Sequence, residues 1–220
     1  MITKVLVANR GEIACRIIDS VQAAGYDAVA VHSDADANAL FVGLADETVS
    51  LGGNTSAESY LDINKIIAAA KASGADAIHP GYGFLSENAE FSALCQENGI
   101  IFIGPSATAI EVMGNKAEAK HLMLSSGVPC IPGYQGETQD AVTLASEANA
   151  IGFPIMVKAA AGGGGRGIRL VESAEALQSA VESARIEAQN AFGSVELILE
   201  KAVVNSRHIE VQIAADQHGN

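Results

Sequence analysis

The chain of 220 residues is acidic, with 26 Asp and Glu against 13 Lys and Arg and a formal net charge of −13. So few basic residues disfavour a nucleic-acid partner, because a phosphate backbone requires a basic protein face. A hydrophobic content of 49% with 22 glycines indicates a globular α/β protein, and no apolar run approaches the roughly 18 residues of a membrane span.

The first half of the chain alternates strand and helix patterns. A helix after residue 12 places Ile13, Ile17 and Val21 at core spacing. Repeated strand and helix alternation predicts a parallel sheet covered on both faces, with ligands at the carboxyl ends of its strands. Strands are predicted at 4–8, 28–33, 76–79 and from 100, and further helices near 61–73 and 87–98.

Two turns at the ends of these strands carry polar residues. Asn9, Arg10, Gly11 and Glu12 follow the first strand, and a single glycine there argues against the G-x-G-x-x-G of a nicotinamide site. We interpret Asn9 as a helix cap and Arg10 as an anchor for a carboxylate or a partner chain.

The second of these turns is HPGYGFLSEN, His79 to Asn88. Its Pro and two Gly residues define a sharp loop that would hold Tyr82 outward, and loops in this position often carry function. A purely structural alternative stays open, in which Tyr82 packs on its neighbours and the backbone satisfies His79.

The pattern changes after Gly104 and Pro105 to short helices. Asn115 can cap the second of these, which places Lys116 in the first turn, where the helix dipole disfavours a cation and a nearby anion would favour it. The following pattern predicts a separate small α+β domain of about 70 residues. Its elements are predicted as helices near 141–150 and 174–191, and strands at 154–160, 168–171 and from 195.

A glycine-rich loop, Gly162 to Gly167, lies between two strands of this domain, and the first strand ends near Lys158. Two or three residues would suffice for a hairpin turn. Glycine N–H groups can surround a phosphate while Arg166 and Lys158 supply charge. The loop and Lys158 therefore indicate a nucleotide phosphate site, and a flexible hairpin tip without function is the alternative.

The last segment, His208 to Asp216, alternates as a strand, with His208, Glu210 and Gln212 on its polar face. The alternative is that this polar row is simply the solvent-exposed face of a sheet. DQHGN then has the composition of a hairpin turn without a return strand, so we expect the 220 residues to be the front part of a longer polypeptide.

The cysteines and the start of the chain bear on location. Cys15, Cys95 and Cys130 are widely spaced, which favours free thiols over a disulfide framework or a zinc site. The first residues, MITKVLVANRGE, form a strand pattern without the character of a signal or transit peptide. These features predict a cytoplasmic protein.

Seven segments together resemble the biotin carboxylases, in the order and spacing of that family and over essentially the whole chain. The resemblance implies an α/β protein of the ATP-grasp superfamily, with a Rossmann-like parallel-sheet domain, a small α+β lid and the start of the main ATP-grasp domain. The segments are ANRGEIACRI, ADETV, AIHPGYGFLSEN, FIGP, MGNKAEAK, GFPIMVKAAAGGGGRGIR and EKAVVNSRHIEVQ.

The resemblance implies a domain division and an activity. The divisions are 1–104 for the Rossmann-like domain, 105–129 for a helical linker, 130–203 for the lid and 204–220 for the first strand of the main domain. Similar enzymes use Mg-ATP to phosphorylate bicarbonate and then carboxylate biotin on a carrier protein or domain. They act with a carboxyltransferase subunit in acyl-CoA or pyruvate carboxylases, and Arg16 lies on a helix that they use for homodimerisation.

Site residues carried over from the family match its motifs position by position. The two lysines would bind the ATP phosphates, the glycine loop would cover them, a hinge would read adenine and a histidine would lie near the ribose. In that order they are Lys116 and Lys158; Gly162, Gly163, Gly164, Gly165, Arg166 and Gly167; Glu200, Lys201, Ala202 and Val203; His208; and, for the biotin pocket, Tyr82.

The resemblance also implies what these 220 residues do not contain. The Mg²⁺ ligands, the general base and the arginines for bicarbonate and biotin would lie beyond residue 220, so we expect no catalytic residue here, no turnover by this piece alone and at best weak nucleotide binding. Two rivals remain: another ATP-grasp ligase, such as the carbamoyl-phosphate synthetase large chain or a purine-pathway carboxylase, and a non-catalytic nucleotide-binding or assembly module.

Overall fold

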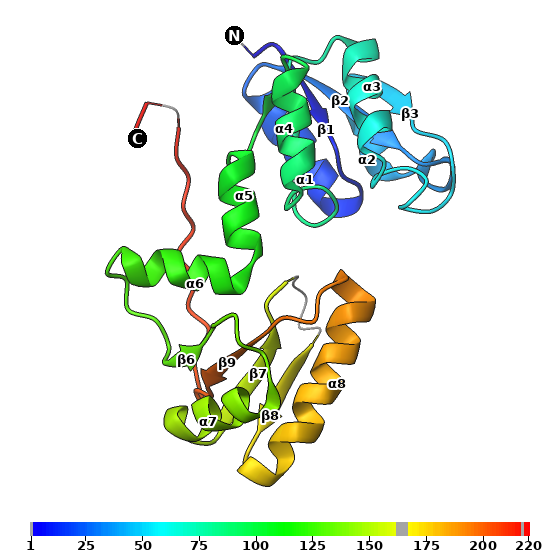
Figure 1. The fold of residues 1–220 in the computed structure, drawn as a ribbon. Coiled ribbons are helices and arrows are strands. Elements are labelled where there is room, and N and C mark those ends of the chain that lie inside the picture. The colour runs from blue at the N-terminus through cyan, green and yellow to red at the C-terminus, as the bar shows by residue number, and fades with distance from the viewer. Residues whose placement is uncertain (1, 162–166, 217) are drawn as a thin grey trace. The chain divides into compact units, whose positions relative to one another are not determined.

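The computed structural model describes residues 2–161, 167–216 and 218–220. The chain divides into two compact units, Met1–Gly114 and Asn115–Asn220 (Figure 1). The boundary therefore lies between two consecutive short helices of the expected linker. The finer division into four parts stays a prediction.

The first unit contains the predicted parallel sheet, with strand order β3-β2-β1-β4-β5. The expected Rossmann-like architecture is thus confirmed. The strands are β1 (Lys4–Val7), β2 (Asp27–His32), β3 (Glu47–Ser50), β4 (Ala77–His79) and β5 (Ile101–Phe102). The helices are α1 (Gly11–Ala23), α2 (Leu40–Leu44), α3 (Ile63–Ser73), α4 (Ala89–Glu97) and α5 (Ala107–Gly114), with a 3₁₀ turn at Asp34–Asp36.

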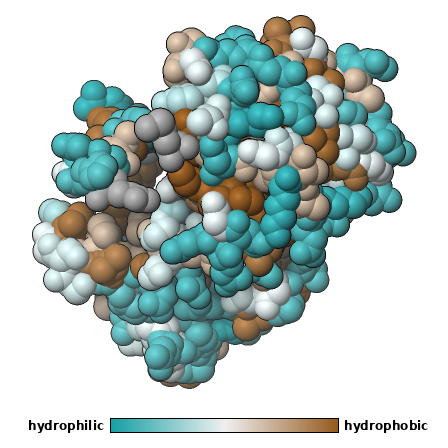
Figure 2. Space-filling model, turned by 90° about the horizontal axis from the view of Figure 1, so that it is seen from above, coloured by the Kyte–Doolittle hydropathy of each residue, from teal (hydrophilic) through white to brown (hydrophobic). Residues whose placement is uncertain are grey.

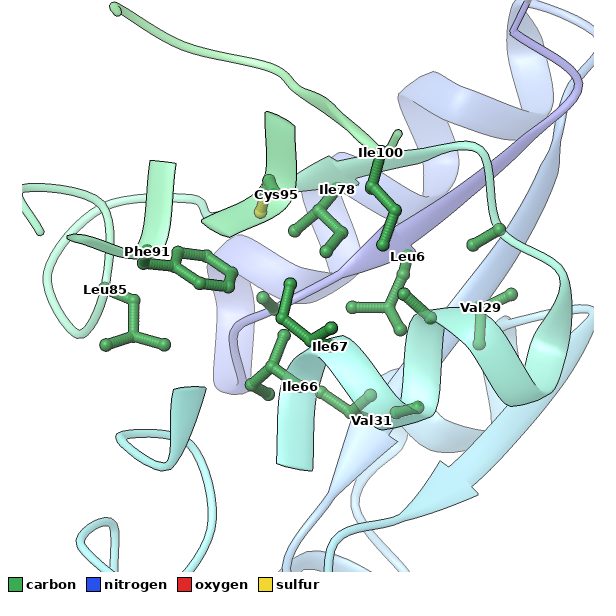
Figure 3. Close-up of a cluster of buried hydrophobic side chains, with 14 of the residues drawn as sticks. Leu6, Val29, Val31, Ile66, Ile67, Ile78, Leu85, Phe91, Cys95 and Ile100 are labelled. Atoms are coloured by element: carbon green, nitrogen blue, oxygen red, sulfur yellow. The ribbon is translucent and has the colours of Figure 1, made fainter. Parts of the chain in front are cut away.

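Both faces of this sheet are buried, as the near-continuous apolar strands require. On one face α3 and α4 pack against alternate residues of β1, β2 and β4, and Figure 3 shows Ile66 and Ile67 gathered with Leu6, Ile78 and Phe91. On the other face the core residues of α1 and α2 cover the intervening strand residues. Because helices cover both faces, the places left for a ligand site on this sheet are the ends of its strands.

The second unit contains an antiparallel sheet with strand order β6-β9-β7-β8. Helices α7 and α8 cover one face of it, where alternate residues of β7 and β9 join their apolar side chains in a core. The strands are β6 (Gly133–Tyr134), β7 (Ile155–Ala159), β8 (Ile168–Val171) and β9 (Leu197–Lys201). The helices are α6 (Lys116–Ser125), α7 (Ala141–Ile151) and α8 (Ala174–Phe192).

The structure differs from the sequence expectations in several segments. β3, β6, α2 and the 3₁₀ turn were not predicted, because each has too few residues to show a clear period. The strand expected at 208–216 is wrong: no regular element is assigned there, and Ile209, Val211 and Ile213 are 74%, 77% and 78% exposed. A strand needs a neighbour for its backbone hydrogen bonds, and none of the assigned strands pairs with this segment.

The surface outside the cores is more hydrophilic than the buried sheet faces. Most of the face shown in Figure 2 is hydrophilic, with hydrophobic residues in scattered patches. Within the described ranges, no helix has both the length and the apolar character needed to cross a bilayer.

Candidate functional site

The face of the second sheet opposite α7 and α8 presents charged side chains. In β7 the residues Ile155 and Val157 enter the core, so Lys158 points to the other face. In β9 the pairing register sets Glu200 opposite Met156, two positions from the partner of Lys158. Diagonal neighbours at this spacing lie within reach of long side chains, and the Lys158 ammonium contacts the Glu200 carboxylate.

The two oxygens of Glu200 are shared between two lysines. Oε2 accepts a hydrogen bond from Nζ of Lys158 at 2.6 Å, and Oε1 accepts one from Nζ of Lys120 at 3.0 Å. Burial raises the pKa of Glu200, but the hydrogen bonds from Lys158 and Lys120 outweigh it and hold that pKa below its ordinary value. Two lysines and one glutamate in their ordinary charged forms give the cluster one net positive charge.

Lys120 was not predicted as a site residue. Its side chain is only 8% exposed, which is unusual for a lysine. The signal that pointed toward it was its position four residues after Lys116, on the same side of a helix, in a chain with few cations. Its carboxylate partner lies 80 residues away, and helical spacing alone does not reveal that pairing.

Lys116 lies in the first turn of α6, as predicted. Asn115 is the N-cap, and its side-chain oxygen accepts hydrogen bonds from the backbone N–H groups of Ala117 and Glu118. The N–H of Lys116 itself donates to Ala160 O at 2.9 Å. The start of α6 is therefore fastened to the chain immediately after β7, beside the entrance to the glycine loop.

The glycine loop itself is described only at its last residue, because Gly162 to Arg166 lie outside the described residues. Gly167 has φ +67°, and a Cβ there would lie 2.9 Å from Ala159 Cβ. Its carbonyl accepts a hydrogen bond from Ala159 N at 3.0 Å. The base of the loop is thus a β7–β8 hairpin end, and a side chain at 167 would disturb it.

The predicted hinge continues from β9. Lys201 N donates to Pro132 O at 2.8 Å and Ala202 N to Pro154 O at 3.0 Å, so both N–H groups are used inside the unit. Nζ of Lys201 also bonds two carbonyl oxygens of the α7–β7 connection, at 2.8 and 2.9 Å. Val203 follows with 57% exposure.

His208 is placed in the exposed segment after the hinge. Its side chain is 88% exposed and its Nε2 lies 3.7 Å from a carboxylate oxygen of Glu210. Because the expected strand does not form, the predicted polar row of the strand is not assembled. The role of His208 near the ribose stays a prediction.

Tyr82 lies in the loop after β4, in the first unit, and is 60% exposed. Nδ2 of the buried Asn9 donates to the carbonyl oxygens of Pro80 and Tyr82, each at 2.8 Å. The interpretation of Asn9 as a helix cap is wrong: Arg10 occupies the cap position and Asn9 instead fastens this loop. The Tyr82 hydroxyl donates to the carboxylate of Glu12, at the start of α1, and this hydrogen bond raises the pKa of Tyr82.

His79 supports the same loop from the end of β4. Its Nδ1 accepts a hydrogen bond from Gly81 N at 3.0 Å, which requires the imidazole to be unprotonated at that nitrogen. Burial, with a smaller contribution from the charge of Arg16, lowers the pKa of His79. The neutral ring is thus favoured, and His79 has the backbone partner that the structural alternative proposed.

Arg10 binds a carboxylate, as expected. Its guanidinium donates from Nε and Nη2 to the two oxygens of Asp36, each at 2.7 Å. The hydrogen bond from Arg10 lowers the pKa of Asp36 to about 2, against the effect of burial and with further help from Tyr60 and Ser33. In the part of the chain that is described, no three His, Cys, Asp or Glu side chains are grouped to hold a metal ion.

Comparisons with known proteins match each unit to a family model. Residues 1–110 match the model "Biotin carboxylase, N-terminal domain" and residues 115–220 match "Carbamoyl-phosphate synthase L chain, ATP binding domain". The chain belongs to the biotin carboxylase family. The resemblance and the expected α/β ATP-grasp architecture are thereby confirmed.

The matched proteins are longer than this chain. The alpha subunit of mitochondrial methylcrotonoyl-CoA carboxylase from Dictyostelium discoideum is 53% identical over 219 residues, which are 100% of this chain and 31% of that protein. Biotin carboxylase 1 of Bacillus subtilis is 48% identical over 220 residues, 100% of this chain and 49% of that enzyme. The chain thus spans about a third to a half of the length of these relatives.

Solved structures give the same family. A biotin carboxylase complex with β-γ-ATP from Campylobacter jejuni aligns with a TM-score of 0.90 and 47% identity, over 93% of this chain and 46% of that one. The biotin carboxylase domain dimer of Hydrogenobacter thermophilus 2-oxoglutarate carboxylase, with MgADP, ADP and bicarbonate, aligns with a TM-score of 0.88 and 47% identity over 93% of this chain and 45% of that one.

Proposed function

We propose that this chain supplies the N-terminal and ATP-binding parts of a biotin carboxylase, which uses Mg-ATP and bicarbonate to carboxylate biotin on a carrier protein or domain. The family membership supports the reaction class. The observation that carries the ATP site is the cluster of Lys120, Glu200 and Lys158, a net positive group on the sheet face away from α7 and α8. Positioned cations are the main means by which proteins stabilise a transferring phosphoryl group.

The phosphate end of ATP would lie at Lys158 and Lys116. Strand β7 carries Lys158, and the backbone after that strand bonds the first residue of α6, Lys116. Both lysines therefore belong to elements joined at the entrance of the glycine loop, Gly162 to Gly167. The arrangement supports a phosphate site over which this loop would fold.

The adenine end would lie along Glu200 to Val203. Since the N–H groups of Lys201 and Ala202 already bond carbonyls within the unit, they are not the donors we propose for the base. Recognition would fall to the Val203 N–H and to hinge carbonyl oxygens, which together offer one donor and several acceptors to the adenine edge. His208 remains the proposed neighbour of the ribose.

Biotin is proposed to contact the loop that presents Tyr82. The loop is held by Asn9 and His79, which fix the backbone while leaving the tyrosine ring exposed. A carrier of biotin, a carboxyltransferase subunit and a second copy of the protein, through the helix of Arg16, are the partners we propose. Mg²⁺ would neutralise phosphate charge when bound, and its ligands are proposed outside these residues.

The family model that matches residues 115–220 is named for the carbamoyl-phosphate synthase large chain, one of the rivals, but the model that matches residues 1–110 is named for biotin carboxylase. The rivals are therefore not favoured. The final acceptor, an acyl-CoA or a keto acid, separates the matched relatives from one another. A cytoplasmic location stays a prediction, since bacterial and mitochondrial relatives both match.

The test is Lys158→Gln in the full-length protein that contains this chain. Loss of one charge-assisted hydrogen bond to phosphate should weaken ATP binding by roughly 10- to 100-fold without unfolding the protein. Arg169→Gln is the matched control, because Arg169 on β8 also pairs with a glutamate but bonds Ser183 and Glu187 of α8, on the opposite face. Equal ATP affinity in both variants would contradict the site.

A further inference from the structure

Lys120 is the most buried member of the charged cluster and the one to which the family motifs assign no role here. The exposed fractions of the Lys120, Glu200 and Lys158 side chains are 8%, 14% and 24%. Burying an ammonium group is unfavourable unless a close partner offsets the loss of its hydration. A single lysine would be enough to form an ion pair with Glu200, so the presence of a second, buried lysine needs another explanation.

The position of Lys120 is built by the packing around it. Ala117, one turn earlier on α6, packs with Ile198 and Ala160 on the charged face of the sheet, which seats the helix there. Gly133 on β6 leaves room for the ammonium group, because a Cβ on that residue would lie 2.7 Å from Nζ of Lys120. The Lys120 ammonium therefore occupies space beside β6 that a side chain at position 133 would fill.

The second lysine changes the charge that an incoming phosphate meets. A Lys158–Glu200 pair alone would be neutral, and the carboxylate would both retain the ammonium and repel the phosphate. With Lys120 on the other oxygen, the cluster keeps one positive charge. If Lys158 turns to a phosphate, Glu200 keeps an ion pair and is not left as a buried, unpaired charge, which would be costly.

We propose that Lys120 is a positioning residue for ATP. It holds and neutralises Glu200, so that the ammonium group of Lys158 can leave that carboxylate and bond the nucleotide phosphates instead. The inference rests on the proposed function of Lys158. In the bound state Lys120 and Glu200 form a buried neutral pair, and Lys158 bonds the phosphate oxygens. Glu200 then acts as the resting partner of Lys158 rather than as a nucleotide ligand through its side chain.

The test measures ATP dissociation constants for four variants of the full-length protein that contains this chain, with thermal unfolding as the folding control. Lys120→Met should weaken ATP binding about tenfold, because Glu200 then retains Lys158. Lys120→Arg keeps the charge and should restore most of the affinity. Glu200→Gln removes the carboxylate that competes for Lys158, so Lys120→Met added to it should change the affinity less than about twofold.

The outcomes separate this inference from the ATP site itself. A folded Lys120→Met protein with unchanged ATP affinity overturns the inference, and so does an equal loss in the Glu200→Gln background, which would mean that Lys120 binds nucleotide directly. Where Lys120→Met does not fold, Lys120→Gln takes its place with the same expectations. An unaltered affinity in Lys158→Gln would instead refute the proposed function, whatever Lys120 does.

Discussion

The two sheets of this chain use their faces differently. The parallel sheet of the first unit is covered by helices on both sides, so its polar residues Asn9, His79 and Tyr82 lie where strands end. The antiparallel sheet of the second unit has its helical core on one face, and its other face carries Lys158 and Glu200. Topology therefore decides whether function is placed on loops or on strands.

The chemistry of the two regions differs in the same way. The backbone of the Tyr82 loop is held by hydrogen bonds from the Asn9 amide and to the His79 imidazole, and the Tyr82 hydroxyl donates to the carboxylate of Glu12. The cluster at Glu200 is held by ion pairs with an excess cation. The first arrangement fixes a loop and leaves its tyrosine ring exposed, and the second is suited to binding an anion.

The largest expected effect is on the stability of the first unit, whose parallel sheet has helices on both faces. Ile78 is fully buried in the core shown in Figure 3, so Ile78→Ala should lower the free energy of unfolding by about 2–5 kcal/mol. Ile101 on the neighbouring strand is 42% exposed, and Ile101→Ala should cost much less. Urea unfolding measures both, and similar losses would show that this sheet is not packed as described.

A smaller effect is expected at the loop of Tyr82. Asn9→Asp removes the two N–H donors and sets a carboxylate against two carbonyl oxygens, which should cost about 1–3 kcal/mol of stability and raise the KM for biotin more than that for ATP. Asn38→Asp, at an exposed position, makes the same chemical change as a control. An unchanged KM for biotin would remove Asn9 from the support of the biotin loop.

The smallest effect is a pH dependence in the first unit. The pKa of Asp36 falls from 3.8 to about 2 on folding, so its stabilisation is present above pH 3.8 and is lost as pH falls through the folded pKa. Between roughly pH 4 and pH 2 the free energy of unfolding of Asp36→Asn should therefore fall by about 1–2 kcal/mol less than that of the unaltered protein. Unfolding measured across that range should give a shallower slope for the variant, and parallel curves would contradict the assignment.

Regular elements with a clear period were predictable from sequence. The helices at 63–73, 89–97, 141–151 and 174–192 and the pairing of β7 with β8 follow from apolar spacing and from turn residues. The two-residue strand β6 was not, because its place in the sheet depends on pairing with β9, more than 60 residues later. The segment at 208–216 shows the converse, since alternation alone does not make a strand without a partner.

The candidate site was predictable only where a local sequence signal marks its residues. Lys158 follows from its position on a strand before a glycine loop, and Lys116 from its helix cap. The burial of Lys120 and its sharing of Glu200 depend on how α6 lies on the sheet, which local spacing does not contain. The role of Asn9 was misread because its partners, Pro80 and Tyr82, lie more than 70 residues away.

Hydrogen exchange measured by mass spectrometry compares the two regions most directly. In the full-length protein that contains this chain, a saturating non-hydrolysable ATP analogue with Mg²⁺ should slow exchange in 116–120, 155–159 and 197–203 of the second unit. Exchange at 8–12 and 79–83, at the strand ends of the first unit, should change little. Protection confined to the first unit's strand ends would contradict the account.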